Sequence, residues 1–210
     1  VPVRLRPWPD RGSDDDGAAS PGTLVSLGAA LEAHPHVHLV GPAGTGKSAL
    51  LRWHAIESAR AVRLGGRLAL LADSGPRRLP VYVPMAAAPA STSLEALAAS
   101  QIGACGLERA EEFLGAHLAS GRALLLFDDL DTLPVLARQS ATERISHLVA
   151  RFPANQVVVA TRDPADRTWL PGFRVMDVVG IDPNQVETLA RRWGYEQVAN
   201  TSGFLQVVER

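Results

Sequence analysis

Residues 41–48 of the chain read GPAGTGKS, which matches the spacing G-x-x-x-x-G-K-[ST] at every fixed position. A loop with this spacing follows a strand and opens a helix, because its glycines let the backbone turn and point successive N–H groups inward at an anion. The flanking residues predict both elements, a short strand at His36–Val40 and a helix at 48–61 with regularly spaced apolar residues. The stretch therefore predicts the strand, loop and helix unit of an α/β fold.

The composition of this loop also predicts its chemistry. Its N–H groups and the positive end of the following helix attract phosphate oxygens. Lys47 is the only lysine among 21 basic residues, which indicates a site that needs a compact ammonium to reach the β and γ phosphates. The hydroxyl of Ser48 is placed to ligate Mg²⁺. The residues expected to bind the nucleotide phosphates are Gly41, Pro42, Ala43, Gly44, Thr45, Gly46, Lys47, Ser48 and Ala49.

A cluster of acidic residues follows the apolar run of the stretch RALLLFDDLDTL at 122–133. Five consecutive apolar residues at 123–127 predict a strand buried on both faces of a parallel sheet. Since ligands of such sheets bind beyond the carboxyl ends of the strands, we expect Asp128 to hold Mg²⁺, directly or through water. Asp129 or Asp131 could orient the attacking water. The alternative, that these acids only cap the next helix, is disfavoured because the three carboxylates repel one another without a cation.

A third strand is predicted at 156–160, and it ends in Thr161, Arg162 and Asp163. If the strand before the phosphate loop and the strand before Asp128 are neighbours, Arg162 emerges at the same edge of the sheet. An arginine there can contact a γ-phosphate and report its presence. The alternative role for Arg162 is an ion pair with Asp163 or Asp166.

The other segments complete a mostly parallel five-stranded sheet with helices on both faces. Residues 1–22 are expected to form an N-terminal strand and a mobile loop, 23–181 the core, and 182–210 the start of a helical subdomain. Because the chain begins with valine and stops inside a helical pattern, we expect a processed or excised piece of a longer chain. The further predicted strands are 79–85 and 173–179, and the further predicted helices are 23–33, 92–102, 107–119 and 182–193.

Composition narrows the classes of function. A chain of 210 residues with 46% hydrophobic residues can bury a sizeable core. Its formal net charge of −1 makes nucleic acid an unlikely partner for this module and gives an anionic membrane little to attract. No apolar run reaches the length of a membrane span and no signal peptide is visible, so we expect a cytoplasmic protein. The lone Cys105 fits a reducing compartment and is expected to be a small core residue.

Two other groups of residues can imitate a metal site. His34, His36 and His38 alternate and would share one face of a strand, but no nearby side chain completes four ligands. Three aspartates at 14–16 are more typical of a solvated turn. We expect neither group to bind a metal.

Five stretches follow one another along the chain: GPAGTGKS, LPVYVPM, GRALLLFDDLDTLP, VVVATRD and DPNQVETLARRW. In the order of these stretches, the chain resembles the STAND class of signal-transducing P-loop NTPases, and within it the NACHT branch. The resemblance implies a three-layer P-loop NTPase fold that holds ATP or ADP with Mg²⁺. It also implies that nucleotide exchange switches a larger protein from a closed monomer to a homo-oligomer. By the same resemblance, Lys47 and Ser48 match the Walker A motif, Asp128 and Asp131 the Walker B aspartates, and Arg162 the sensor arginine.

The chain departs from the NACHT pattern at two positions. Thr132 stands where that pattern usually has glutamate, and Asp129 resembles the second of the paired aspartates in the related NB-ARC branch. The resemblance therefore leaves open whether Asp129 or Asp131 is the hydrolytic base. It also implies that the elements that lock ADP in this class would lie beyond Arg210.

An alternative class is an AAA+ type ATPase, a motor or loader acting on DNA or protein, since paired aspartates after an apolar strand occur there too. Against it stand the sequence TRD at 161–163, where an asparagine is missing, and the near-neutral charge. The chain lacks the NKxD motif of GTPases, the LSGGQ motif of ABC proteins, and the G-x-S-x-G motif of serine hydrolases.

Overall fold

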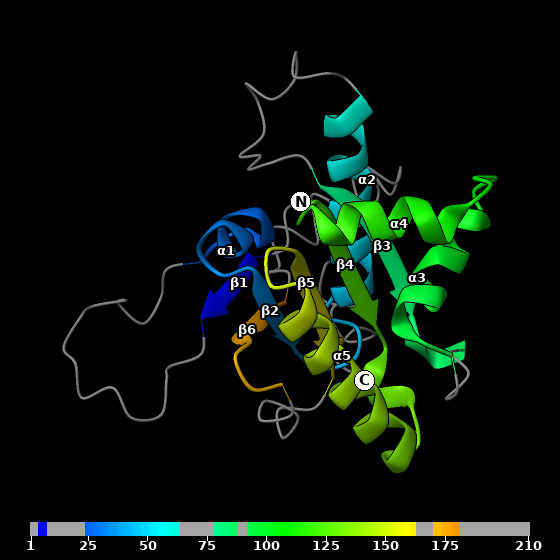
Figure 1. Ribbon diagram of the computed structural model, residues 1–210. Coiled ribbons are helices and arrows are strands. Elements are labelled where there is room, and N and C mark those ends of the chain that lie inside the picture. Colours follow the sequence, from blue (N-terminus) through cyan, green and yellow to red (C-terminus); the bar gives the residue numbers. More distant parts are fainter. Residues whose placement is uncertain (1–3, 8–23, 64–77, 88–91, 163–169, 181–210) are drawn as a thin grey trace, which may run out of the picture.

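In the part of the chain that the structure describes, six strands form one sheet in the order β1-β6-β2-β5-β4-β3 (Figure 1). The structure is a computed structural model, and it describes residues 4–7, 24–63, 78–87, 92–162 and 170–180. The sheet is parallel throughout except at β1, which pairs antiparallel with β6. The strands are β1 (Arg4–Pro7), β2 (His36–Val40), β3 (Leu79–Pro84), β4 (Ala123–Asp128), β5 (Gln156–Thr161) and β6 (Arg174–Val179).

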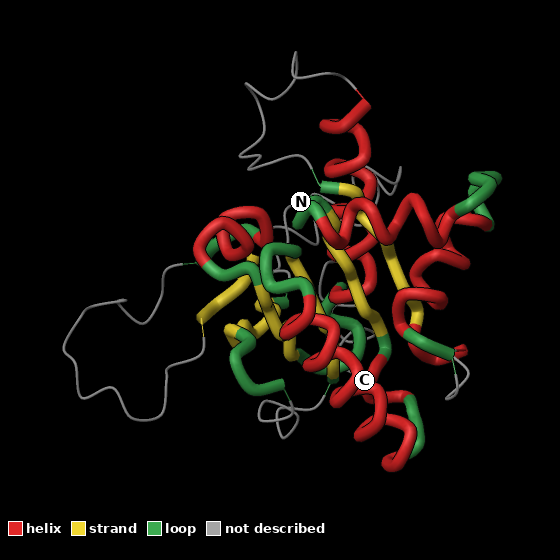
Figure 2. Tube along the Cα trace, viewed as in Figure 1, coloured by secondary structure: helices red, strands yellow, loops and turns green. Residues whose placement is uncertain are grey.

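Helices cover both faces of the sheet and give the molecule three layers (Figure 2). On one face α1 and α2 pack against the strands, and on the other face α3, α4 and α5 do so. The helices are α1 (Leu27–Ala33), α2 (Lys47–Arg63), α3 (Leu94–Gly103), α4 (Ala110–Ala119) and α5 (Val135–Arg151), with short 3₁₀ turns η1 (Met85–Ala87) and η2 (Leu130–Thr132).

The central strands β4 and β5 are buried on both faces. Along β5, Val157 and Val159 belong to the core under α3, α4 and α5, whereas Val158 and Ala160 belong to the core under α1 and α2. Successive side chains of a strand point to opposite faces, so a strand between two helical layers needs apolar residues at every position. The apolar runs in the sequence are therefore explained, and the predicted α/β fold is confirmed.

Two predictions about the sheet are wrong. The sheet has six strands rather than five, because the N-terminal strand pairs with β6 and fully buries Leu5. The strand before the phosphate loop, β2, is not a neighbour of β4, since β5 lies between them and pairs with both. Long-range pairing of this kind leaves no local signal in the sequence.

The helical layers differ from prediction at two further places. The sequence patterns above contain no prediction for α5, although its buried residues Ala141, Ile145 and Leu148 recur at the spacing of one helix face. Cys105 is exposed and not a core residue, because it lies in the turn after the end of α3. The residues predicted as a mobile loop, 10–22, and as a helical subdomain, 182–210, lie outside the described residues, so the division of the chain into three parts stays a prediction.

Candidate functional site

The phosphate loop, residues 41–48, joins the carboxyl end of β2 to the first residues of α2. Gly44 and Gly46 have φ angles of 82° and 90°, a left-handed conformation in which a side chain is strained. The hydroxyl of Thr45 donates to the Pro42 carbonyl at 2.9 Å and closes the turn. The N–H of Gly41 donates to the Thr161 carbonyl at 3.3 Å, which ties the loop to the end of β5.

Lys47 is buried inside this loop, with 8% of its surface exposed. Its Nζ donates to the carbonyl oxygens of Gly41 and Pro42, the latter at 2.8 Å. Burial lowers the pKa of Lys47, and the negative charge of Asp131 acts against that shift. The first turn of α2 contains no acidic residue, so the positive end of the helix dipole next to Lys47 is not neutralised there. The loop therefore places a buried ammonium at the positive end of α2, with Ser48 half-buried and Ala49 exposed on the same turn.

Asp128 lies at the carboxyl end of β4 and is 1% exposed. Its Oδ1 accepts the backbone N–H of Asp129 at 3.0 Å, and its Oδ2 accepts the hydroxyl of Tyr82 on β3 at 2.6 Å. Burial, reinforced by the hydrogen bond to Asp128, raises the pKa of Tyr82 to about 12, so its phenol is a hydrogen-bond donor at ordinary pH. The Asp128 carboxylate is thus held from two sides.

Arg162 follows the last residue of β5 and pairs with both of the other acids. Its Nη2 lies 3.1 Å from Asp129 Oδ1, and its Nε lies 3.5 Å from Asp131 Oδ2. The hydrogen bond to Asp129 and the charge of Asp131 raise the pKa of Arg162. Asp129 itself has a φ angle of 58°, a left-handed turn that precedes η2. Within the described residues the partners of Arg162 are therefore Asp129 and Asp131; the alternatives Asp163 and Asp166 lie outside them.

Among the carboxylate oxygens of Asp128, Asp129 and Asp131, Asp131 Oδ1 is the buried one without a hydrogen-bond partner among the described residues. Buried carboxylate oxygens normally accept a hydrogen bond or bind a cation. Thr132, by contrast, uses its hydroxyl locally, donating to the Asp129 carbonyl at 2.7 Å within η2. Asp131 therefore has one buried oxygen without a hydrogen-bond partner among the described residues, whereas the hydroxyl of Thr132 has one.

The sheet order explains how these groups meet. The strands β2, β4 and β5 run parallel, so their carboxyl ends lie at one edge of the sheet. The phosphate loop follows β2, Asp128 is the last residue of β4, and Arg162 follows β5. The charges of Asp131, Arg162, Asp128 and Asp129 all act on Lys47. The structure thus brings the predicted site residues together, with β5 and Arg162 between the loop and Asp128.

Tyr82 is a polar residue of this edge that the sequence reasoning missed. A signal was present, because a tyrosine within an apolar strand usually finds a partner for its hydroxyl. Arg52 of α2 adds a second contact, with its guanidinium carbon 5.1 Å from the centre of the Tyr82 ring.

The histidines of β2 take structural roles. His38 is fully buried, and its Nε2 lies 2.9 Å from the hydroxyl of Thr161. The ring of His36 packs on Phe173, with 5.4 Å between ring centres. No group of three potential metal ligands occurs within the described ranges, and residues 14–16 lie outside them.

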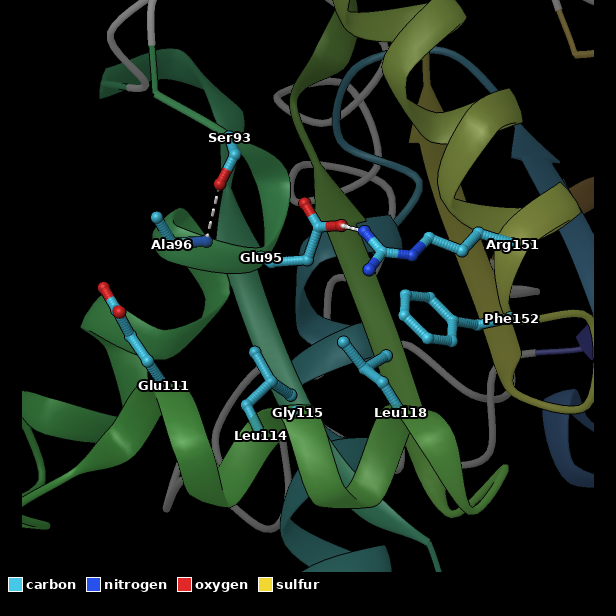
Figure 3. A pocket seen from close by; sticks show the side chains of 9 residues that line it. All are labelled: Ser93, Glu95, Ala96, Glu111, Leu114, Gly115, Leu118, Arg151 and Phe152. Atoms are coloured by element: carbon cyan, nitrogen blue, oxygen red, sulfur yellow. Dashed lines mark hydrogen bonds and ion pairs between the residues drawn. The ribbon is translucent and has the colours of Figure 1, made fainter.

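A pocket of about 410 Å³ lies away from the phosphate loop, between α3, α4 and the end of α5 (Figure 3). In Figure 3, Arg151 reaches from α5 toward Glu95 and passes over the ring of Phe152. The Arg151 Nη1 and Glu95 Oε1 atoms are 3.8 Å apart; Arg151 is largely exposed and Glu95 is half-buried. The pocket contains no residue of the phosphate loop or the acidic cluster, so it is not part of the site described above.

A phosphate loop at the carboxyl edge of a parallel sheet, with helical layers on both faces, defines the class of the P-loop NTPases. The sequence profile of the NACHT domain matches residues 36–197, which is most of the chain. The chain therefore belongs to the NACHT domain family. None of its described helices has the length and apolar character needed to cross a membrane.

Three solved structures are similar to part of this chain at low sequence identity. The Orc1 protein of Aeropyrum pernix in complex with DNA is 21% identical with a TM-score of 0.48, and the match covers 77% of this chain and 44% of that one. AMPPCP-bound DnaA from Aquifex aeolicus is 16% identical with a TM-score of 0.42, and the match covers 80% of this chain and 49% of that one. PCH-2 of C. elegans is 15% identical with a TM-score of 0.40, and the match covers 75% of this chain and 41% of that one. This chain spans less than half the length of each of these proteins. No protein with a curated description matches the chain.

Proposed function

We propose that this chain is the ATP- and ADP-binding module of a STAND-type signalling or defence protein, in which nucleotide state and not turnover is the output. The observation that carries the proposal is the pairing of Arg162 with both Asp129 and Asp131. The same guanidinium can bind either these carboxylates or the terminal phosphate of a nucleotide. Nucleotide binding would thereby change the contacts of η2, the turn that leads into α5.

Phosphate binding is assigned to the loop residues 41–49. The Nζ of Lys47 now satisfies two loop carbonyls, and the β and γ phosphates would take their place as partners. Backbone N–H groups of the loop and the dipole of α2 supply the rest of the attraction. Adenine is assigned on the family resemblance alone.

The side chains present fit a magnesium ion. Ser48 at the start of α2 offers a hydroxyl and Asp128 offers a carboxylate, and both are oxygen ligands of the kind that Mg²⁺ prefers. The unpartnered oxygen of Asp131 is suited to a water in the same shell. When bound, Mg²⁺ would neutralise charge that builds up on the phosphates.

Asp131 is the better candidate for the hydrolytic base, and Asp129 is the second. One oxygen of Asp131 is free of protein partners among the described residues and can accept a proton from an attacking water, while the other contacts Arg162. Asp129 receives the closer contact from Arg162, at 3.1 Å, and lies in a strained left-handed turn. Because the position after Asp131 is a threonine occupied within η2, we expect hydrolysis to be slow.

The proposal includes two kinds of partner. The first is the rest of a longer parent chain, which would hold the ADP form closed. The second is further copies of the same protein, which would assemble when ATP replaces ADP. The signal and the effector belong to those other segments.

The test is to purify the chain without added nucleotide, denature it, and identify what is released by chromatography. About one ADP per chain would support a switch that traps its product. The variant Lys47→Ala is the control and should release none. An empty site combined with steady ATP turnover would overturn the switch and favour a motor.

A further inference from the structure

Tyr82 and Asp128 are diagonal neighbours on the same face of the sheet. In the parallel register of β3 and β4, Tyr82 pairs with Leu126 and Pro84 pairs with Asp128. Residues two apart along a strand share a face, and a diagonal neighbour is within reach of an aromatic side chain. The hydroxyl of Tyr82 therefore meets Asp128 Oδ2, at 2.6 Å, from the side of β3.

The second hydrogen bond of Asp128 comes from another direction. The backbone N–H of Asp129 donates to Oδ1 at 3.0 Å, and each oxygen of the carboxylate thereby has one donor. An ionised carboxylate oxygen has two lone-pair positions, so one position on each oxygen remains open. Two donors from different strands and turns fix the plane of the carboxylate and decide where these open positions point.

The ring of Tyr82 also contacts Arg52, a residue of the helix that follows the phosphate loop. Arg52 lies on α2, five residues after Lys47, and its guanidinium carbon is 5.1 Å from the centre of the Tyr82 ring. Tyr82 is half-buried and also packs against the core under α1 and α2. The ring of Tyr82 thus links β3 to α2, the helix that follows the phosphate loop, while its hydroxyl bonds Asp128 on β4.

We propose that Tyr82 is a positioning residue, which orients the Asp128 carboxylate toward a Mg²⁺ ion bound with the nucleotide. The inference rests on the proposed function, since it takes the Asp128 carboxylate as a ligand of Mg²⁺. Phenylalanine at position 82 keeps the ring beneath the Arg52 guanidinium but removes the hydroxyl that donates to Asp128 and also interacts with Arg52. Asp128 would then keep only the hydrogen bond from the Asp129 N–H, and the bound metal would have a less well-oriented ligand.

The experiment is a calorimetric titration of the purified chain with ADP, at a series of MgCl₂ concentrations and in EDTA. For Tyr82→Phe, we expect the half-saturating Mg²⁺ concentration to rise roughly ten- to a hundredfold, the value of one hydrogen bond to a charged group, with unchanged ADP affinity in EDTA. Ser100→Ala is the matched control, because it also removes a hydroxyl donor, 2.7 Å from the Leu97 carbonyl in α3 and away from the site. It should leave the Mg²⁺ dependence unchanged.

Failure of the inference and failure of the proposed function are distinguishable. Suppose that ADP binding by the unsubstituted chain requires Mg²⁺, and that Tyr82→Phe has the same or a lower half-saturating Mg²⁺ concentration. The positioning role of Tyr82 is then wrong and the proposed function stands. If ADP binding by the parent chain is indifferent to Mg²⁺, the metal assignment of Asp128 fails, and the inference fails with it. A readout without ligand is the urea unfolding of Tyr82→Phe, Asp128→Ala and the double variant. Non-additive midpoint shifts support the hydrogen bond, and additive shifts contradict it.

Discussion

The Nζ of Lys47 lies 2.8 Å from the Pro42 carbonyl and also contacts that of Gly41, so the lysine closes its own loop. The same ammonium is the group that we expect to meet phosphate. If it does so, nucleotide binding would exchange two neutral acceptors of Lys47 for charged ones, and hydrogen bonds between ionised groups are the stronger kind.

Lys47→Ala should lower nucleotide affinity by at least about tenfold. Two unit charges about 4 Å apart attract by roughly 4 kcal/mol at an effective dielectric near 20, before desolvation is subtracted. Equilibrium titration with ADP measures the effect. Arg60→Ala is the control, since Arg60 is a cation of the same helix that pairs with Glu57 at an exposed position. Equal affinities for Lys47→Ala and the parent chain would refute the assignment of the loop.

Arg162→Ala should reduce the preference between ATP and ADP, by about threefold or more, because it removes the group that we propose as the sensor of the terminal phosphate. Its effect on stability should be below about 1 kcal/mol, since its ion pairs with Asp129 and Asp131 are partly exposed. Competition between the two nucleotides gives the ratio of affinities. Arg122→Ala, at the opposite edge of the sheet before β4, is the matched control. A ratio unchanged by Arg162→Ala would mean that this arginine is not the sensor.

Asn155→Ala should destabilise the fold by about 2–4 kcal/mol, because it removes the partner of more than one buried group. Asn155 is fully buried; its Oδ1 accepts from the Ala123 N–H at 2.9 Å, and its Nδ2 donates to the Leu118 carbonyl at 2.9 Å. These bonds join the end of α4 to the start of β4. Urea unfolding measures the loss, and Glu143→Ala on the exposed side of α5 is the control. A loss as small as that of the control would show that water replaces the amide.

Stability should fall on acidification below about pH 6.5, the ordinary pKa of histidine. Burial lowers the pKa of His36 and of His54 in the folded chain. The unfolded chain therefore takes up protons first as the pH falls, and the free energy of unfolding decreases until the pH is below the folded values. His54→Gln should make this pH dependence shallower, as measured by urea unfolding between pH 7 and 5. His147→Gln, at an exposed position of α5, is the control. A slope that His54→Gln leaves unchanged would contradict the role of His54.

The parts of the fold that follow from local patterns were predictable. The apolar runs before Asp128 and Arg162 predicted the bounds of β4 and β5 to within one residue. A strand that is buried on both faces needs apolar side chains at nearly every position, so its run stands out in the sequence. The glycine spacing predicted the phosphate loop, since few residues tolerate the φ angles of Gly44 and Gly46.

Features that depend on distant parts of the chain were not predictable. The position of β5 between β2 and β4 follows from packing of whole layers, and so does the choice of Asp129 and Asp131 as partners of Arg162. The hydrogen bond between Tyr82 and Asp128 joins residues 46 positions apart. Cys105 shows the limit of composition, because a small apolar side chain fits a core and a surface turn equally well.

The pairing of β1 with β6 also sets a practical boundary for any shortened version of the chain. The NACHT match begins at residue 36, but Leu5 is fully buried and exchanges two backbone hydrogen bonds with Val25. At the other edge, Pro80 and Pro84 on β3 lack the N–H groups that another strand needs for pairing. A fragment trimmed to the family boundary would uncover β6 as a bare edge strand without that protection. Such a fragment should aggregate through strand addition, so expression for crystallisation should begin before residue 4.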